Sequence, residues 1–142
     1  MTNDSQSPAD TERRAEPQSL RGHDLAVSLT VKDLQKSLAW YQDLLGFTID
    51  RKHEREGKLV AVSLKAGTVR VLLNQDNGAK GWDRVKGEGM SLQITTNQSV
   101  DDIAKRIKDR GGELASEPAD MPWGPRMFRV RDPDGFLFAI SS

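Results

Sequence analysis

The sequence predicts an α/β fold of the α+β type, in which two tandem βαβββ modules form a curved mixed sheet around a cavity. Three observations carry this prediction. An alternating apolar segment opens each half of the chain, as expected for a half-buried strand. A helical stripe of apolar residues follows each of these segments. Three further strand-like segments then complete each half, and the 142-residue length accommodates two such units.

In the first half, the strand is expected at 25–31, where apolar and small polar residues alternate. Asp33 is a plausible N-cap for the helix that follows, and Gly46 closes it. Its buried stripe consists of Leu34, Leu38, Tyr41 and Leu45. Three strands are expected next, at 47–51, 59–65 and 68–74.

The second half repeats the plan, with a strand at 91–95 and a helix capped by Ser99. The buried stripe of this helix consists of Val100, Ile103, Ala104 and Ile107. Strands are expected at 113–116, 127–131 and 136–140. An Asp-Pro-Asp-Gly turn joins the last two strands, because proline fixes φ early in a turn and glycine supplies a positive φ later.

Domain limits follow from composition. Residues 1–22 are polar and charged, and such a segment cannot bury enough apolar surface to offset its ordering entropy, so we expect a disordered tail. The modules are expected at about 23–76 and 89–142, with a glycine-rich linker at 77–88.

The overall composition excludes several partners. Basic and acidic residues number 21 each, and no element gathers a basic stripe, so nucleic acid is not expected as a partner. No apolar run reaches the roughly 20 residues of a membrane helix, and no signal peptide is evident. Cysteine is absent, which excludes disulfides and thiolate ligands. A cytoplasmic location is the default expectation.

Two groups of motifs resemble the vicinal oxygen chelate superfamily, which includes glyoxalase I, ring-cleaving dioxygenases and bleomycin resistance proteins. The first is Val-Lys-Asp-Leu at 31–34 followed by Trp-Tyr at 40–41 and Leu-Gly-Phe at 45–47. The second is the closing hairpin with its Asp-Pro-Asp-Gly turn at 132–135. The resemblance covers residues 25–141 and implies the repeated βαβββ fold.

Metal-dependent members of that superfamily carry His, Glu or Gln ligands on the first and last strand of each half. The resemblance places these ligand positions at Ala26, Arg70, Ser91 and Ala139. A methyl group has no lone pair and a guanidinium repels a cation, so no metal or other cofactor is expected. Of the two histidines, His23 precedes the first strand, and His53 is predicted to lie in a solvated hairpin loop.

Without a metal, the same sheet faces are expected to line a ligand pocket. The residues expected there are Ala26, Ser28, Thr30, Arg70, Ser91, Gln93, Thr95, Leu137 and Ala139. Trp123, in a Pro-Trp-Gly segment like that of bleomycin resistance proteins, either stacks on a ligand or fills the end of the sheet. Trp82 either closes over the pocket as a lid or anchors the linker.

Arg126, Arg129 and Arg131 alternate along one strand, where they either share a face and attract an anion or form ion pairs in solvent.

The functional prediction is a metal-independent small-molecule binding protein, most similar to the bleomycin resistance branch, that sequesters an aromatic drug or metabolite. The resemblance implies a homodimer with ligand grooves built from both subunits. An alternative is a metal-dependent lyase, isomerase or dioxygenase with atypical ligands. A third hypothesis is a structural or regulatory subunit whose pocket is vestigial. The sequence shows no histidine or carboxylate suitably placed for acid–base catalysis in the pocket.

Overall fold

The computed structural model describes residues 19–142, and the expected tail at 1–22 lies almost wholly outside them. Residues 19–26 form neither helix nor strand, and Leu20 and Leu25 are fully exposed. Between residues 19 and 142, no helix has both the length and the apolar character needed to cross a bilayer.

The first module contains one helical segment and four strands. Its elements are β1 (Val27–Val31), α2 (Leu34–Trp40), the π-helix η1 (Tyr41–Leu45), β2 (Thr48–Arg55), β3 (Lys58–Ala66) and β4 (Val69–Gln75). The strands form a sheet of order β1-β4-β3-β2, in which β1 is parallel to β4 and the other pairs are antiparallel.

The second module repeats this arrangement. Its elements are β5 (Leu92–Thr95), α3 (Val100–Asp109), β6 (Ser116–Asp120), β7 (Arg126–Arg131) and β8 (Leu137–Ser141). The sheet order is β5-β8-β7-β6, again with its outer pair β5 and β8 parallel. The mixed α+β fold with two modules is therefore confirmed, but the strands form two separate four-stranded sheets rather than one continuous curved sheet.

The first helical segment begins and ends where the sequence predicts. The Asp33 carboxylate accepts a hydrogen bond from the Lys36 backbone N–H at 3.1 Å, and Gly46 ends the segment at φ +80°. The last turn, however, is a π-helix. The wider π turn changes the helical phase, so Leu44 is buried and Leu45 is only half-buried.

Three strands differ from their predicted limits by more than one residue at an end. β1 begins at Val27, where its pairing with β4 starts, and Leu25 and Ala26 before it are exposed and belong to no strand. β2 continues through the charged residues 51–55, which were predicted to be a loop. It is an edge strand, where charges are favourable because they discourage pairing with another chain. β6 lies at 116–120 and includes Pro118, which an edge strand tolerates.

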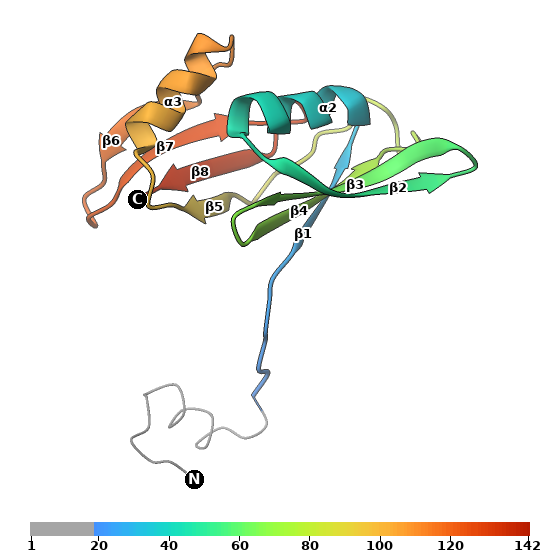
Figure 1. The fold of residues 1–142 in the computed structure, drawn as a ribbon, viewed down its shortest axis with the longest axis horizontal. Helices are drawn as coiled ribbons and strands as arrows, with labels where there is room; N and C mark the ends of the chain where they lie inside the picture. Colours follow the sequence, from blue (N-terminus) through green and yellow to red (C-terminus); the bar gives the residue numbers. More distant parts are fainter. Residues whose placement is uncertain (1–18) are drawn as a thin grey trace.

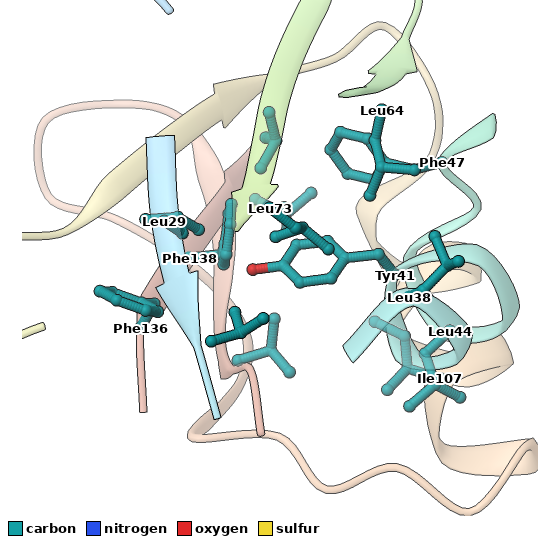
Figure 2. Packing of buried hydrophobic residues seen from close by; sticks show 14 of the residues in the cluster. Leu29, Leu38, Tyr41, Leu44, Phe47, Leu64, Leu73, Ile107, Phe136 and Phe138 are labelled. Carbon is teal, nitrogen blue, oxygen red and sulfur yellow. The ribbon is translucent and has the colours of Figure 1, made fainter. Parts of the chain in front are cut away.

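Both modules share one hydrophobic core, which lies between the helices and one face of each sheet. Tyr41 is at its centre (Figure 2) and is fully buried. Its ring makes edge-to-face contacts with Phe47 of its own module and with Phe138 of β8 in the other module, at centroid distances of 5.8 and 5.7 Å. The opposite face of each sheet carries no helix (Figure 1).

A buried ion-pair cluster holds the linker against both modules. Lys86 Nζ lies 3.0 Å from a carboxylate oxygen of Asp76, which follows β4, and 3.1 Å from one of Asp134, in the turn before β8. Each of the three side chains is exposed by 7 % or less. Lys32 adds an exposed ion pair to Asp83 at 2.7 Å. The segment between the modules is thus tied down at several points.

Candidate functional site

The helix-free face of the first sheet, called here open face A, brings several predicted site residues together. The β1–β4 register pairs Ser28 with Leu72 and Thr30 with Asn74, so these side chains share one face. Asn74 Nδ2 donates a 2.7 Å hydrogen bond to Ser28 Oγ. On the neighbouring strand β3, Ala61 pairs with Asn74 and Ser63 pairs with Leu72, so these two side chains lie on the same face. The face is therefore mostly small and neutral-polar, as the sequence predicts.

Arg70 lies near the end of open face A and is largely exposed. Its guanidinium approaches the Asp50 carboxylate at 3.5 Å, and Lys65 Nζ approaches the same carboxylate at 3.7 Å. A β-bulge between Ile49 and Arg51 allows Asp50 to reach both cations. Ala26 lies outside β1 and is exposed, and the first residue of β1, Val27, pairs with Val71, which follows Arg70.

His53 belongs to open face A, and its predicted position in a loop is wrong. It pairs with Ala61, which pairs in turn with Asn74, so the three residues form one row across the sheet. His53 Nε2 lies 3.4 Å from Ser63 Oγ, and the side chain is half-buried. The sequence alone gave no apolar alternation at 51–55 to reveal this strand. The open face consequently holds one imidazole that the sequence interpretation missed.

The corresponding face of the second sheet, open face B, carries the remaining strand residues predicted for the site. Gln93, Ala139 and Arg129 form a single row across β5, β8 and β7, and Leu137 pairs with Arg131 in the next row. Ser91 directly precedes β5 and is exposed. Thr95 pairs with the buried Ser141.

The predicted arginine row divides between the two faces of β7. Arg129 and Arg131 lie on open face B, whereas Arg126 points to the opposite face because side chains alternate along a strand. Arg126 makes a bidentate contact with Asp101 of α3, at 2.8 and 3.0 Å, and a further contact with Asp120 at 3.1 Å. The half-buried Arg129 guanidinium, by contrast, has no hydrogen-bond or ion-pair partner among residues 19–142.

The two candidate tryptophans lie outside the open faces. Trp123 is 65 % exposed in the turn between β6 and β7, so it does not fill the core. Trp82 is 49 % exposed and packs within the linker: a Cβ placed on Gly78 would lie 2.4 Å from its ring. This packing favours the anchoring role for Trp82 over the role of a lid.

The predicted site is thus divided between two sheets within one chain. Ser28 and Arg70 lie on open face A, and Gln93, Leu137 and Ala139 lie on open face B. Three grooves on the described surface each contain one predicted residue: Leu137 lines one beside the linker, Thr30 lines another near Asp76, and Thr95 lines a third between the modules. None of the three joins the two open faces.

The four positions that the resemblance assigns to metal ligands carry side chains that do not suit a divalent cation. Ala26 and Ala139 offer no donor atom, and Ser91 offers only a neutral hydroxyl. Arg70, at the remaining position, is positively charged, and Arg129 pairs directly with Ala139. No group of three or more His, Cys, Asp or Glu side chains within the described part of the chain is placed to hold a metal ion.

A pair of titratable groups with shifted pKa values lies in the core, away from both open faces. The Tyr41 hydroxyl donates a 2.7 Å hydrogen bond to the buried Asp132 carboxylate. Burial raises the pKa of Tyr41 and also that of Asp132. The Asp132 carboxylate also accepts hydrogen bonds from the backbone N–H groups of Asp134 and Phe136, which shape the turn before β8. This pair therefore stabilises the contact between modules rather than forming a reactive site.

Asp76 should make the protein less stable in acid. Its pKa is lowered from 3.8 to about 2, chiefly by the backbone N–H of Gly78 and then by Lys86. The stabilisation is therefore complete above the unfolded-state pKa of 3.8 and is lost as the pH falls towards 2. Asp132 has the opposite effect on the pH dependence of stability, because its pKa is raised in the folded protein. Urea unfolding between about pH 6 and pH 2 should show a weaker acid-dependent loss in Asp76→Asn than in the wild type. Equal losses in the two proteins would contradict this assignment.

Comparisons with known proteins agree with the fold. The model of the Glyoxalase/Bleomycin resistance protein/Dioxygenase superfamily matches residues 25–140. A probable lactoylglutathione lyase of Synechocystis is 29 % identical over 123 residues, covering 82 % of this chain and 92 % of the relative. A superfamily member from Sphaerobacter thermophilus has a similar structure, with a TM-score of 0.69 and 24 % identity over 85 % of this chain and 97 % of the other.

A glyoxalase I mutant from Zea mays is also similar, with a TM-score of 0.70 and 25 % identity. The match covers 82 % of this chain but only 44 % of the maize protein. The repeated module, the strand order and the family match over almost all of residues 25–140 lead to one conclusion. The chain belongs to the Glyoxalase/Bleomycin resistance protein/Dioxygenase superfamily.

Proposed function

We propose that this protein is a metal-independent small-molecule binding protein of the bleomycin resistance type. The observation that carries the proposal is the position of two arginines. Arg70 itself occupies one of the four expected ligand positions, and Arg129 pairs with Ala139 at another, so a cation stands at or directly beside each of these two positions. A divalent ion at either place would meet electrostatic repulsion in addition to the missing donors.

The remaining side chains suit an organic ligand. Small hydroxyls and amides, such as those of Ser28, Asn74 and Gln93, supply neutral hydrogen-bonding groups across the two faces. The exposed ring of Trp123 offers a rigid surface on which a planar ligand can stack. This combination supports sequestration of an aromatic drug or metabolite. If the ligand is an antibiotic, its capture confers resistance.

The proposal includes a homodimer that acts in the cytoplasm. The two open faces belong to separate sheets in one chain, and each exposes polar side chains on a surface without a helical cover. A second copy placed against them would enclose a cavity between a face of one subunit and a face of the other. This arrangement would bury most of a ligand, as small-molecule sites usually do.

Ligand binding can be tested by tryptophan fluorescence on chelator-treated protein, using a panel of planar aromatic compounds. We expect saturable quenching that Trp123→Phe removes and that the matched linker variant Trp82→Phe retains. Light scattering after gel filtration should give the mass of a dimer. Absence of saturable binding throughout the panel, or quenching that depends only on Trp82, would argue against the proposed site.

A second candidate function is catalysis, and His53 is the observation that favours it. This half-buried imidazole lies on open face A with Ser63 at 3.4 Å, and histidine is the commonest general acid–base group. The Synechocystis relative is itself named a probable lactoylglutathione lyase. Lyase or isomerase activity, with or without added metal, that is lost in His53→Gln would support this candidate. Ligand binding that His53→Gln leaves unchanged, without turnover, would support the binding function.

A further inference from the structure

A groove of about 440 Å³ lies between the two modules, and Thr95 is the one predicted site residue among its described lining residues. One wall comes from residues 45–47, where η1 ends, and from the β3–β4 turn at 66–69. The other wall comes from residues 94–98 and from Ile103 and Arg106 of α3. Its volume falls in the range of roughly 300–1,000 Å³ that is typical of small-molecule sites.

The lining of this groove has two parts. Its apolar part is formed by Leu45, Phe47, Val69, Ile94, Ile103 and Ile140. Its polar part consists of threonine hydroxyls and the amides of Asn97 and Gln98, together with Arg106. Arg106 is the only charged residue among the described residues that line the groove, and no carboxylate is among them.

The Arg106 guanidinium is fixed in position but incompletely paired. Its Nη2 donates to the carbonyl oxygens of Leu44 and Leu45, at 3.4 and 3.1 Å, and so caps the end of η1. Gly46 makes this approach possible, because a Cβ there would lie 2.9 Å from Nη2. Its Nε is buried and has no hydrogen-bond partner. A buried donor without an acceptor is unfavourable, and more so when it carries charge.

We propose that this groove is a second binding site, one that takes a small apolar carboxylate. The carboxylate binds the part of the Arg106 guanidinium that lines the groove, in a charge-assisted hydrogen bond. The apolar body packs on Leu45, Phe47 and Ile103.

Two other grooves on the described surface differ in this respect, because carboxylates line them: Glu88 and Asp134 in one, and Asp76 in the other. Arg84 and Lys86, which line them, already face Asp76 at 3.4 and 3.0 Å. A carboxylate would have to compete with these existing partners, whereas the groove at Arg106 presents a cation with no acidic competitor. Charge complementarity therefore singles out the groove between the modules.

The probes are sodium hexanoate and the uncharged 1-hexanol, titrated into the full chain by calorimetry and by ¹H–¹⁵N NMR. Hexanoate should bind in one-to-one stoichiometry and at least about tenfold more tightly than 1-hexanol, because charge-assisted hydrogen bonds are the stronger class. The backbone signals of Thr96 and Gln98 and the side-chain Nε–H signal of Arg106 should shift together. Equal binding of the two probes, no saturable binding, or shifts confined to Gln93 and Arg129 on open face B would overturn the proposal.

Three variants locate the site. Arg106→Met should weaken hexanoate binding by about tenfold or more. Arg110→Met is the matched control, since Arg110 also lies at the end of α3 and donates to a carbonyl of the first module, that of Asp43 at 2.6 Å, but does not line the groove. It should leave binding unchanged.

Thr68→Trp places a bulky side chain at the exposed β3–β4 turn and should block the groove without removing the cap on η1. Thr68 is exposed and is not part of the hydrophobic core, so this variant should fold. It therefore still tests whether hexanoate binds in the groove if Arg106→Met does not fold. Undiminished hexanoate binding to folded Thr68→Trp would place the ligand elsewhere.

Discussion

Replacement of Lys86 by methionine is expected to lower the free energy of unfolding by about 3 kcal/mol, because it removes one partner from a buried ion-pair cluster. Lys86 Nζ neutralises Asp76 and Asp134 at 3.0 and 3.1 Å, and its side chain is only 7 % exposed. Methionine fills a similar volume but removes the ammonium group that neutralises the buried carboxylates of Asp76 and Asp134. Arg84 and the backbone N–H of Gly78 retain their contacts with Asp76, which limits the loss.

Chemical unfolding monitored by circular dichroism tests this prediction. Lys80→Met is the matched control, since Lys80 is an exposed lysine in the same linker, and it should change stability by less than about 0.5 kcal/mol. Adding Asp134→Asn to Lys86→Met should restore part of the stability by removing one uncompensated charge. Equal stability of the Lys86 and Lys80 variants would mean that the cluster does not hold the linker to the two modules.

Truncation of Phe138 to alanine is expected to cost about 3–5 kcal/mol, through lost burial and the cavity that remains. Phe138 is fully buried, and its ring contacts Tyr41 of the other module at 5.7 Å. Because the core is continuous across both modules, the wild type and the variant should each unfold in a single transition. Phe138→Leu should lose clearly less stability.

Two separate unfolding transitions in Phe138→Ala, with the first module keeping its original stability, would contradict the shared core. Calorimetry distinguishes these cases through the ratio of the calorimetric to the van't Hoff enthalpy.

The parts of the fold that the sequence predicts are those where local chemistry and periodicity agree. Asp33 and Gly46 mark the ends of the first helical segment, and both act as predicted. Ser99 caps α3, whose buried residues are Val100, Ala104 and Ile107. In each case a capping side chain, a glycine or a stripe of apolar residues specifies the element without reference to distant parts of the chain.

The features that the sequence did not reveal depend on tertiary pairing. The charged residues around His53 lack apolar alternation, yet they form an edge strand because β3 supplies the hydrogen bonds. The role of Lys86 also depends on two carboxylates that lie far apart in the sequence. The sequence could not show that Arg126 and Arg129 lie on opposite faces of β7, because this depends on the limits of the strand and on which of its faces is buried.

The candidate site shows the same contrast between what local patterns predict and what depends on tertiary pairing. Alternation correctly placed Ser28 and Thr30 on the helix-free side of β1 and Gln93 and Ala139 on that of the second sheet. It could not show that these two faces belong to separate sheets, or that Arg129 pairs with Ala139. The division of the site follows from how the modules pack through their helices, which no single strand encodes.

Metal content is the most direct test of metal-independent binding. Protein purified without an affinity tag or chelator should be analysed by elemental mass spectrometry, and its thermal unfolding followed with added Ni²⁺, Zn²⁺, Mn²⁺, Fe²⁺ and Mg²⁺. Arg70 at one expected ligand position and Arg129 beside Ala139 at another lead us to expect well under one metal ion per chain and no saturable rise in Tm. Stoichiometric metal, or a rise in Tm that saturates at one ion per site, would contradict the proposed function and favour a metal-dependent enzyme.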